Sequence, residues 1–565
     1  MNSIASIFLD VPTEDQSLVY PVISCCLLVV PSTILFGLIM ISGKRGQDQH
    51  YHFALIDTIR SNRHRFVRGD DFFLIGPKVI YPQLVHWCLS LLPDPVSMQV
   101  GRYLSVVMVF LSTLAFSIFT WQMYPVIFPE GGPGQWEFLS LSLALYVFTP
   151  YSYYTNNAKN AGLSVRAVGV LLLELLFYSL VLYLTGKGAL FLYASVVIGL
   201  VILLSSQFAS QVFLFVLPVA SLVLGEPSLL LVPALTISIY MVVLPGFFFA
   251  YARGQWYHKS FYCRYLAKNF ILELRPSIWR DFIYDFWARF KSQPESSVNG
   301  ALARRLLSRF YWTLKYALGN SVILLVVGMP LVLIATVLLF THLGVGSSSL
   351  WGRHDTTAIM GGLVLSALVV FFLTTFRPTR FLGEPERYAE SVNVLAVILT
   401  TLFLINMYPY WVALLSAVFI VTLLFLLMQV GVLLLQKYES NGQRGLYVMR
   451  NRLLEIASSS EEPPRVLANG MFQIRSLMSS RLRLVYGWAQ FRLGGLPYRE
   501  VVEGDRMYRR EYMGHLARYY DVNYLLLQAP DIHEFTAELE GQGLVLRQVD
   551  SFENCYLFEL ISERD

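Results

Sequence analysis

A series of long apolar runs constrains the fold of this chain more than any other feature. A helix needs about 20 predominantly apolar residues to cross the hydrocarbon core of a membrane. Because several runs are short, and 188–224 fits either two tight spans or one broken span, we predict about eleven membrane helices. The runs lie at residues 18–42, 100–124, 136–150, 163–184, 188–205, 206–224, 229–252, 320–343, 356–376, 391–408 and 409–436.

The composition agrees with a multi-pass membrane protein. Of the 565 residues, 55% are hydrophobic and 14% are charged, and the mean hydropathy is +0.53. A soluble domain cannot bury that much apolar surface, whereas a membrane protein exposes it to lipid. We expect no removable signal peptide, because no short apolar segment with a small-residue cleavage site opens the chain. The net charge of +5 is modest, and we expect no nucleic-acid partner.

The cysteines indicate neither a zinc ribbon nor a disulfide framework. Such sites need closely spaced pairs, most often CxxC. Two of the five cysteines lie in the first apolar run, and the rest are scattered without such a pair: Cys25, Cys26, Cys88, Cys263 and Cys555.

The composition changes after Gln436, where a charged and mixed tail begins. Its segments "PRVLANG", "YDVNYLLL", "GLVLRQVDSF" and "NCYLFEL" are typical of β-strands, and "DIHEFTAELEGQG" is typical of a helix closed by glycine. We therefore predict an all-α polytopic membrane domain over residues 1–436, followed by a small soluble α/β domain over 437–565.

Three polar islands interrupt the apolar part, at residues 43–95, 253–320 and 377–390. All three islands and the tail follow odd-numbered spans of the eleven predicted, so they are expected on one side of the membrane. Basic residues crowd the second island, so the positive-inside rule alone would place the islands in the cytoplasm. Long loops are partly exempt from that rule, and cations that bind phosphate would also break it. Charge therefore leaves the orientation open.

The first island, "GKRGQDQHYHFALIDTIRSNRHRF", places an acid directly after the first apolar run. The spacing of Phe53, Ile56 and Ile59 predicts a short amphipathic helix lying on the membrane. Asp48, held at the bilayer surface, could accept a proton from an incoming hydroxyl as a general base. The alternative is a solvated acid paired with neighbouring lysine and arginine.

Other polar residues carry weaker signals. His50 and His52 are expected to bond substrate or backbone, because two histidines alone make no zinc site. Asp70 and Asp71, in "RGDDFFLIGPK", are weak candidates for metal ligands. Glu174 lies inside an apolar run, where a carboxylate facing lipid is costly, so we expect it to face the bundle interior.

The order of these segments resembles the GT-C superfamily of integral membrane glycosyltransferases. The resemblance rests on one span, the acidic segment, then "YPQLVHWCLSLLP" and "GRYLSVVMVFLSTL" entering the next span. Asp48 takes the position of the family acid. Gln49 stands where a second acid is frequent, and Gln83 replaces the second proline of a Tyr-Pro-Pro-Leu pattern. "NNAKNAGLSVRAVGVLLLELL" and the tail segment also resemble family members, among them aminoarabinose and protein O-mannosyltransferases and oligosaccharyltransferase catalytic subunits.

The resemblance implies an orientation and a reaction. The islands and tail would be exoplasmic, and periplasmic at the inner membrane of a bacterium. The donor would be a polyprenyl-phosphate sugar, the acceptor a hydroxyl of a glycan, lipid or protein, and Asp48 the base. Arg and Lys suit phosphate oxygens. Candidates to bind the donor phosphate or the substrate are His50, His52, Lys78, Arg102, Glu384 and Arg387. Many relatives need no metal, so the resemblance implies no particular cofactor, and a divalent cation is compatible with it.

Two other functions fit the same chain. One is a glycan polymerase or ligase that uses a diphosphate-linked oligosaccharide, which differs mainly in its donor. The other is a transporter of lipid-linked glycans, which would need polar residues distributed through the spans. Here the polar residues gather outside the spans, which favours the enzyme. The basic, aromatic island at 253–320 fits either a donor groove or a membrane anchor.

Overall fold

The structure is a computed structural model of the whole chain. It describes residues 13–42, 49–67, 72–74, 80–153, 162–266, 320–342, 355–376, 379–405, 410–439, 441–470, 477–486, 490–503, 507–529 and 532–561. Four predicted site residues lie outside these ranges: Asp48, Asp70, Asp71 and Lys78. Most of the basic island at 253–320 also lies outside them.

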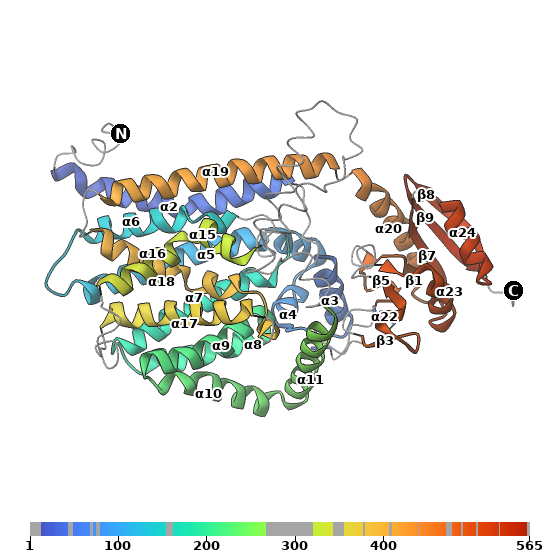
Figure 1. Cartoon of the computed structure of the whole chain (residues 1–565), viewed down its shortest axis with the longest axis horizontal. Coiled ribbons are helices and arrows are strands. Elements are labelled where there is room, and N and C mark those ends of the chain that lie inside the picture. Colours follow the sequence, from blue (N-terminus) through green and yellow to red (C-terminus); the bar gives the residue numbers. More distant parts are fainter. Residues whose placement is uncertain are drawn as a thin grey trace.

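Each predicted apolar run contains a helix, and these helices lie side by side in one bundle (Figure 1). Near-continuous apolar sequence favours helices here, because a helix satisfies its own backbone hydrogen bonds away from water. The bundle comprises α2 (Thr13–Ser42), α5 (Asp94–Ile127), α6 (Gln135–Val147), α7 (Val165–Leu184), α8 (Leu190–Ser205), α9 (Gln207–Leu224), α10 (Ser228–Val243), α15 (Ser321–Gly328), α16 (Pro330–His342), α17 (Thr356–Thr375), α18 (Glu386–Ile405) and α19 (Tyr410–Glu439).

Fewer of these helices than predicted have the length of a full span. Within the described residues, seven are long and apolar enough to cross a membrane: α2, α5, α7, α9, α17, α18 and α19. An eighth span would consist of α15 and α16, which meet at an 82° bend before Pro330. Proline cannot donate the backbone hydrogen bond that would continue α15. The remaining predicted spans correspond to the shorter helices α6, α8 and α10.

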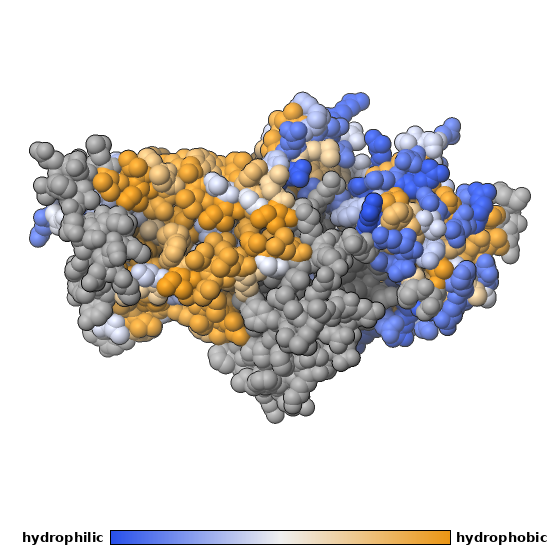
Figure 2. All heavy atoms as spheres, turned by 90° about the horizontal axis from the view of Figure 1, so that it is seen from above, coloured by the Kyte–Doolittle hydropathy of each residue, from blue (hydrophilic) through white to orange (hydrophobic). Residues whose placement is uncertain are grey.

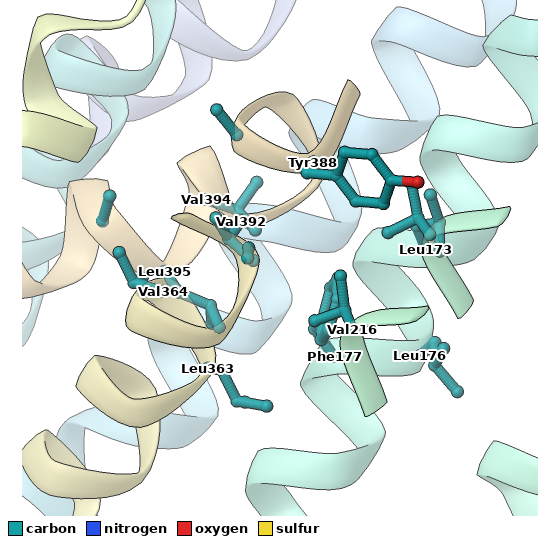
Figure 3. Packing of buried hydrophobic residues seen from close by; sticks show 14 of the residues in the cluster. Leu173, Leu176, Phe177, Val216, Leu363, Val364, Tyr388, Val392, Val394 and Leu395 are labelled. Atoms are coloured by element: carbon teal, nitrogen blue, oxygen red, sulfur yellow. The ribbon is translucent and has the colours of Figure 1, made fainter. Parts of the chain in front are cut away.

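The bundle has a buried centre and an apolar exterior. Helix α18 is central, with 83% of its span buried, whereas α19 is peripheral, with 22% buried. Figure 3 shows the packing of α18 residues such as Val392 and Leu395 with Leu173, Phe177 and Val216 from the neighbouring helices. In Figure 2, hydrophobic side chains cover the visible face of the bundle and hydrophilic ones cover the C-terminal domain. An apolar outer surface of this kind is stable only against lipid.

The C-terminal domain begins with α20 (Asn441–Ser459) and contains a five-stranded sheet of order β2-β1-β7-β9-β8. Strand β1 is parallel to β2 and β7, and β9 is antiparallel to β7 and β8. The predicted strands are confirmed as β1 (Arg465–Ala468), β7 (Tyr524–Gln528), β8 (Val545–Phe552) and β9 (Cys555–Ile561), and the predicted helix as α24 (Ile532–Gly541).

The sequence analysis did not identify the other elements of this domain. Besides α20, they are β2 (Arg483–Leu484), β3 (Arg492–Leu493), β4 (Leu496–Pro497), α22 (Tyr498–Val501), β5 (Val502–Glu503), β6 (Met507–Tyr508) and α23 (Arg510–Tyr519). The strands among them have two residues each, which is too short for an alternating pattern to be visible.

Short helices lie between the bundle and the C-terminal domain (Figure 1). They include α3 (Gln49–Ser61), α4 (Leu84–Ser90), α11 (Pro245–Phe261) and the π-helix η3 (Tyr262–Leu266); the 3-10 helices η1 (Pro150–Tyr153) and η4 (Arg380–Leu382) lie in connections of the bundle. The domain is attached there by a bridge between Phe73 and Leu484, and Phe261 is part of its hydrophobic core.

The predicted amphipathic helix is present as α3, but its apolar face packs on other helices of the protein and not on lipid as expected. Its apolar face is covered by protein, since Ile56 and Ile59 are almost fully buried. Ile56 packs with Leu89 of α4 and Leu104 of α5. Gly101 makes the approach to α5 close, because a β-carbon there would lie 3.2 Å from the ring of Phe53. These neighbours provide the apolar contact that lipid was expected to provide.

Candidate active site at the end of the helical bundle

The predicted catalytic residue directly precedes α3 in the sequence. Asp48 itself lies outside the described residues, whereas Gln49, His50 and His52 at the start of α3 are buried. His50 faces Tyr447 of α20, with ring centroids 6.2 Å apart. The segment after Asp48 therefore reaches the first helix of the C-terminal domain.

His52 and His86 form a buried pair. The distance from His52 Nδ1 to His86 Nε2 is 2.9 Å, so one ring donates and the other accepts. Burial, with a smaller contribution from His52, lowers the pKa of His86 well below its usual value. Tyr81 packs edge-on against both rings. This contact with His86 fixes the ring of His52 on α3.

Gln83, the departure from the family pattern, holds the first island together. Its side-chain oxygen accepts from Val67 N at 2.9 Å, and its side-chain nitrogen donates to Val67 O at 2.7 Å. Gln83 is 2% exposed, and a proline could not replace this two-way bridge because it has no polar side-chain atoms. Next to it, Trp87 Nε1 donates to His64 O at 2.9 Å. The residues around "YPQL" therefore hold in place the segment that follows α3.

A buried network of charges lies where α7 meets the start of α18. Arg166 of α7 lies 3.4 Å from a carboxylate oxygen of Glu390 and 3.6 Å from one of Glu384. Arg387 pairs with Glu384. Arg166, Arg387 and Glu390 are each less than 10% exposed, whereas the Glu384 side chain is 29% exposed. We call Arg166, Glu384, Arg387 and Glu390 the α7–α18 charge network.

An aromatic ring and a glycine shape this network. The guanidinium carbon of Arg387 lies 3.4 Å from the ring centre of Phe208, and that of Arg166 lies 5.8 Å from it. Gly383 precedes Glu384 and has a backbone φ of +115°, which residues other than glycine rarely adopt. A β-carbon at Gly383 would also meet the side chain of Gln211 at 2.5 Å.

Helix α11 brings two further titratable groups to the network. With the Gln211 amide assigned by its hydrogen bonds, its oxygen accepts from Lys259 Nζ at 3.0 Å and its nitrogen donates to Leu382 O at 3.2 Å. Burial, and then the neighbouring Arg387, lowers the pKa of Lys259 to about 8. Burial, followed by Lys259 and Arg387, lowers the pKa of His258 to about 4. Lys259 is thus a cation that can lose its proton near neutral pH.

The predicted site residues fall into three groups. Glu384 and Arg387 come together, with Arg166 and Glu390 as their partners. His50 and His52 lie on α3, which packs on the start of α5. Arg102, in α5, is exposed, and its guanidinium carbon lies 5.6 Å from the ring centre of Tyr103.

The sequence analysis did not single out Arg166. The feature that could have identified it is the position of this arginine near the start of the apolar segment "SVRAVGVLLLELL". Ionisable residues within spans are rare and usually face a protein interior or a functional site. The same reasoning predicted that Glu174 faces the bundle interior. This prediction is confirmed, since Glu174 is 4% exposed.

Among the described residues, no three His, Cys, Asp or Glu side chains are grouped to hold a metal ion. The carboxylates suggested for that role, Asp70 and Asp71, lie outside the described ranges. A metal-binding role for them stays a prediction.

Comparisons with known proteins bear on the fold. No protein-family model matches the sequence, and no curated protein matches it significantly. Among solved structures, the chain is similar to the Archaeoglobus fulgidus oligosaccharyltransferase, whose crystal structure is a complex with Zn and sulfate. The match covers 94% of this chain and 72% of that chain, with 12% sequence identity and a TM-score of 0.50. At this identity the likeness shows the fold alone. It confirms the predicted GT-C type of fold, a polytopic helical domain with a small C-terminal α/β domain.

Proposed function

We propose that this protein is a membrane glycosyltransferase that moves a sugar from a polyprenyl-phosphate donor to an acceptor hydroxyl at the exoplasmic face. The observation that carries the proposal is the combination of a GT-C type fold with buried polar groups gathered at one end of the bundle. The α7–α18 charge network includes Arg166 near the start of α7, and Val168 of the same helix shares an apolar cluster with Ile56 of α3, the helix that directly follows Asp48. The acceptor would belong to a cell-envelope glycan, lipid or protein.

In this proposal Asp48 is the general base. It takes the proton of the acceptor hydroxyl while the hydroxyl oxygen attacks the anomeric carbon of the donor. The bond to the phosphate oxygen breaks, so the configuration inverts and the polyprenyl phosphate leaves. Cations that neutralise the phosphate make it a good leaving group without a separate acid. The His52–His86 pair positions α3, and thereby the residues directly before it.

The donor phosphate needs a cation that is not already neutralised. Arg166 and Arg387 face Glu384 and Glu390, so a phosphate would compete there with two carboxylates. Lys259 pairs with an amide oxygen instead, and Arg102 is exposed. Lys259 joins Lys78 and Arg102 as the best candidates to contact the phosphate. The partly exposed Glu384 is the member of the network best placed to bond a sugar hydroxyl.

A divalent cation would be held, if needed, by Asp48 with Asp70 or Asp71. The reaction as proposed is written without a metal-dependent step. Activity measured with and without a chelator tests this directly: full activity in the chelator would remove the cation from the proposal.

A transfer assay tests the function. The purified protein in nanodiscs is given either a polyprenyl-monophosphate sugar or a polyprenyl-diphosphate oligosaccharide, with envelope extract as acceptor. We expect transfer from the monophosphate and a loss of about 10²–10⁴-fold in Asp48→Asn, the usual cost of a missing general base. Asp57→Asn, a change at a partly exposed acid on α3, is the matched control. Equal rates in wild type and Asp48→Asn would remove Asp48 from its role.

The fold neighbour gives the second candidate function its support. That protein is an oligosaccharyltransferase, which favours an oligosaccharide as the transferred group. The alternative donor is the diphosphate-linked oligosaccharide named in the sequence analysis. Transfer from that donor alone would establish it. Movement of either lipid across proteoliposomes without transfer would instead establish a transporter.

Accessibility of single cysteines tests the orientation. Ser61 at the end of α3 and Ser551 in β8 are both exposed. We expect Ser61→Cys and Ser551→Cys, in a background without the native cysteines, to react with an impermeant reagent in intact cells. Reaction only after permeabilisation would place both in the cytoplasm, as the positive-inside rule suggests.

A further inference from the structure

A crevice lies within the bundle and reaches Ala167, the residue that follows Arg166 of the charge network. It is bordered by α2, α5, α6, α7 and η1. Its lining residues are Pro31, Met108, Val109, Ser112, Tyr146, Ser152, Ala167, Val170 and Glu174. One carboxyl group, one phenol and two hydroxyls thus share a space with five apolar residues.

The crevice has a polar floor and a more open apolar side. Glu174 is 4% exposed and Ser112 is 6% exposed. Met108, Val109 and Val170 are half-buried, so the apolar side is the more accessible one. Tyr146 is stacked on Phe116 with ring centroids 4.6 Å apart, which fixes the phenol beside the carboxyl group.

The carboxyl group lies deep in the membrane domain. Glu174 is the tenth of the 20 residues of α7. At 1.5 Å per residue, it is about 13 Å along the helix axis from the first residue, near the middle of the span. A carboxylate at this depth is costly unless a positive charge or hydrogen-bond donors accompany it, and such residues commonly mark binding sites.

We propose that this crevice binds the ammonium head of a single-chain cationic amphiphile, such as a long-chain primary amine. Glu174 provides the opposite charge for a charge-assisted hydrogen bond. The hydroxyls of Ser112 and Ser152 and the phenol of Tyr146 can accept the remaining ammonium hydrogens, and aromatic rings attract cations. Met108, Val109 and Val170 contact the hydrocarbon chain. The proposal does not depend on the proposed function.

Binding of dodecylamine by the purified full-length protein in nanodiscs tests this site. Native mass spectrometry over a range of amine concentrations gives the affinity, and nanodiscs without protein give the background. We expect saturable binding that weakens at least about tenfold in Glu174→Gln, since a charge-assisted hydrogen bond contributes roughly 1.5–3 kcal/mol. Glu137→Gln, which neutralises an exposed acid at the start of α6, should bind like wild type. Dodecanol, with the same chain and no charge, should not compete.

A second variant keeps the test decisive if Glu174→Gln does not fold. Val170→Phe leaves the carboxyl group in place and narrows the apolar side of the crevice, so it should also weaken amine binding. Equal affinity in wild type and Glu174→Gln, or in wild type and Val170→Phe, would overturn the proposal. Absence of saturable binding to wild type would overturn it as well.

Discussion

The helical bundle and the C-terminal domain both contain pairs of an arginine and an acidic residue, but these pairs differ in burial. In the α7–α18 charge network, Arg166 and Glu390 have side chains 9% and 5% exposed. In the C-terminal domain, Arg465 and Asp521 form a closer pair, at 3.0 Å, but their side chains are 37% and 83% exposed. Distance alone would rank the second pair higher. Burial reverses that order, because a charge left without its partner in the bundle cannot be solvated by water.

The difference shows which charges the fold depends on. Exposed ion pairs contribute little, since water and salt screen them. The buried network joins α7 to the segment before α18, so it holds together residues more than 200 positions apart in the chain. Replacing charges in the two regions should therefore have very different effects.

Arg166→Met should produce the largest change. It leaves Glu384 and Glu390 without their shared cation, which for a buried pair costs about 3–5 kcal/mol. Reversible unfolding in mixed micelles measures the free energy. Arg166→Met combined with Glu390→Gln should recover part of the loss, because the buried charge is removed with its partner. A loss below 1 kcal/mol in the single variant would mean that the network is solvated like the surface pairs.

Gly383→Ala should come next. The positive φ strains any other residue by about 1–3 kcal/mol, and the new β-carbon would meet Gln211. The matched control is Gly541→Ala at the end of α24, where nothing lies within 4 Å of the added carbon. Unfolding free energies of the two variants give the comparison. Equal values would show that the turn before α18 relaxes at no cost.

His258 should make stability depend on acid pH. Its folded-state pKa of about 4 lies below the ordinary value of 6.5, so between these values only the unfolded chain takes up a proton. Stability should therefore fall as pH decreases from about 6.5 to 4, by roughly 1–3 kcal/mol after allowing for partial exposure. His258→Gln should reduce this slope. His533→Gln, at an exposed position on α24, should retain it, and identical slopes in all three proteins would contradict the prediction.

The smallest effect is expected in the C-terminal domain. Arg465→Ala should cost about 0.2–1 kcal/mol, the range for exposed ion pairs, and the cost should shrink further in high salt. The same unfolding measurement at two salt concentrations tests it. A loss as large as that of Arg166→Met would remove the contrast between the two regions.

Local sequence patterns were enough to predict the classes of structure. Long apolar runs predicted the bundle helices. A segment inside lipid must satisfy its backbone hydrogen bonds without water, and a helix does so within the segment. Alternating residues predicted β1, β7, β8 and β9, because side chains in a strand point to opposite faces in turn. The position of Glu174 followed from the cost of a carboxylate in lipid. These features depend on neighbours in the sequence, which the chain itself displays.

Contacts between distant residues were decided only by the tertiary structure. The sequence pointed to Glu384 and Arg387 as a charged turn, but their pairing with Arg166 needs α7 and α18 to lie side by side. The apolar face of α3 would suit a membrane surface equally well, and the approach of α4 and α5 buried it in protein instead. Glu384 and Glu390 resemble any exposed acids in the sequence, yet one is partly exposed and the other buried. Burial, which sets the strength of every charge in this protein, is a property of the packed fold and not of local sequence.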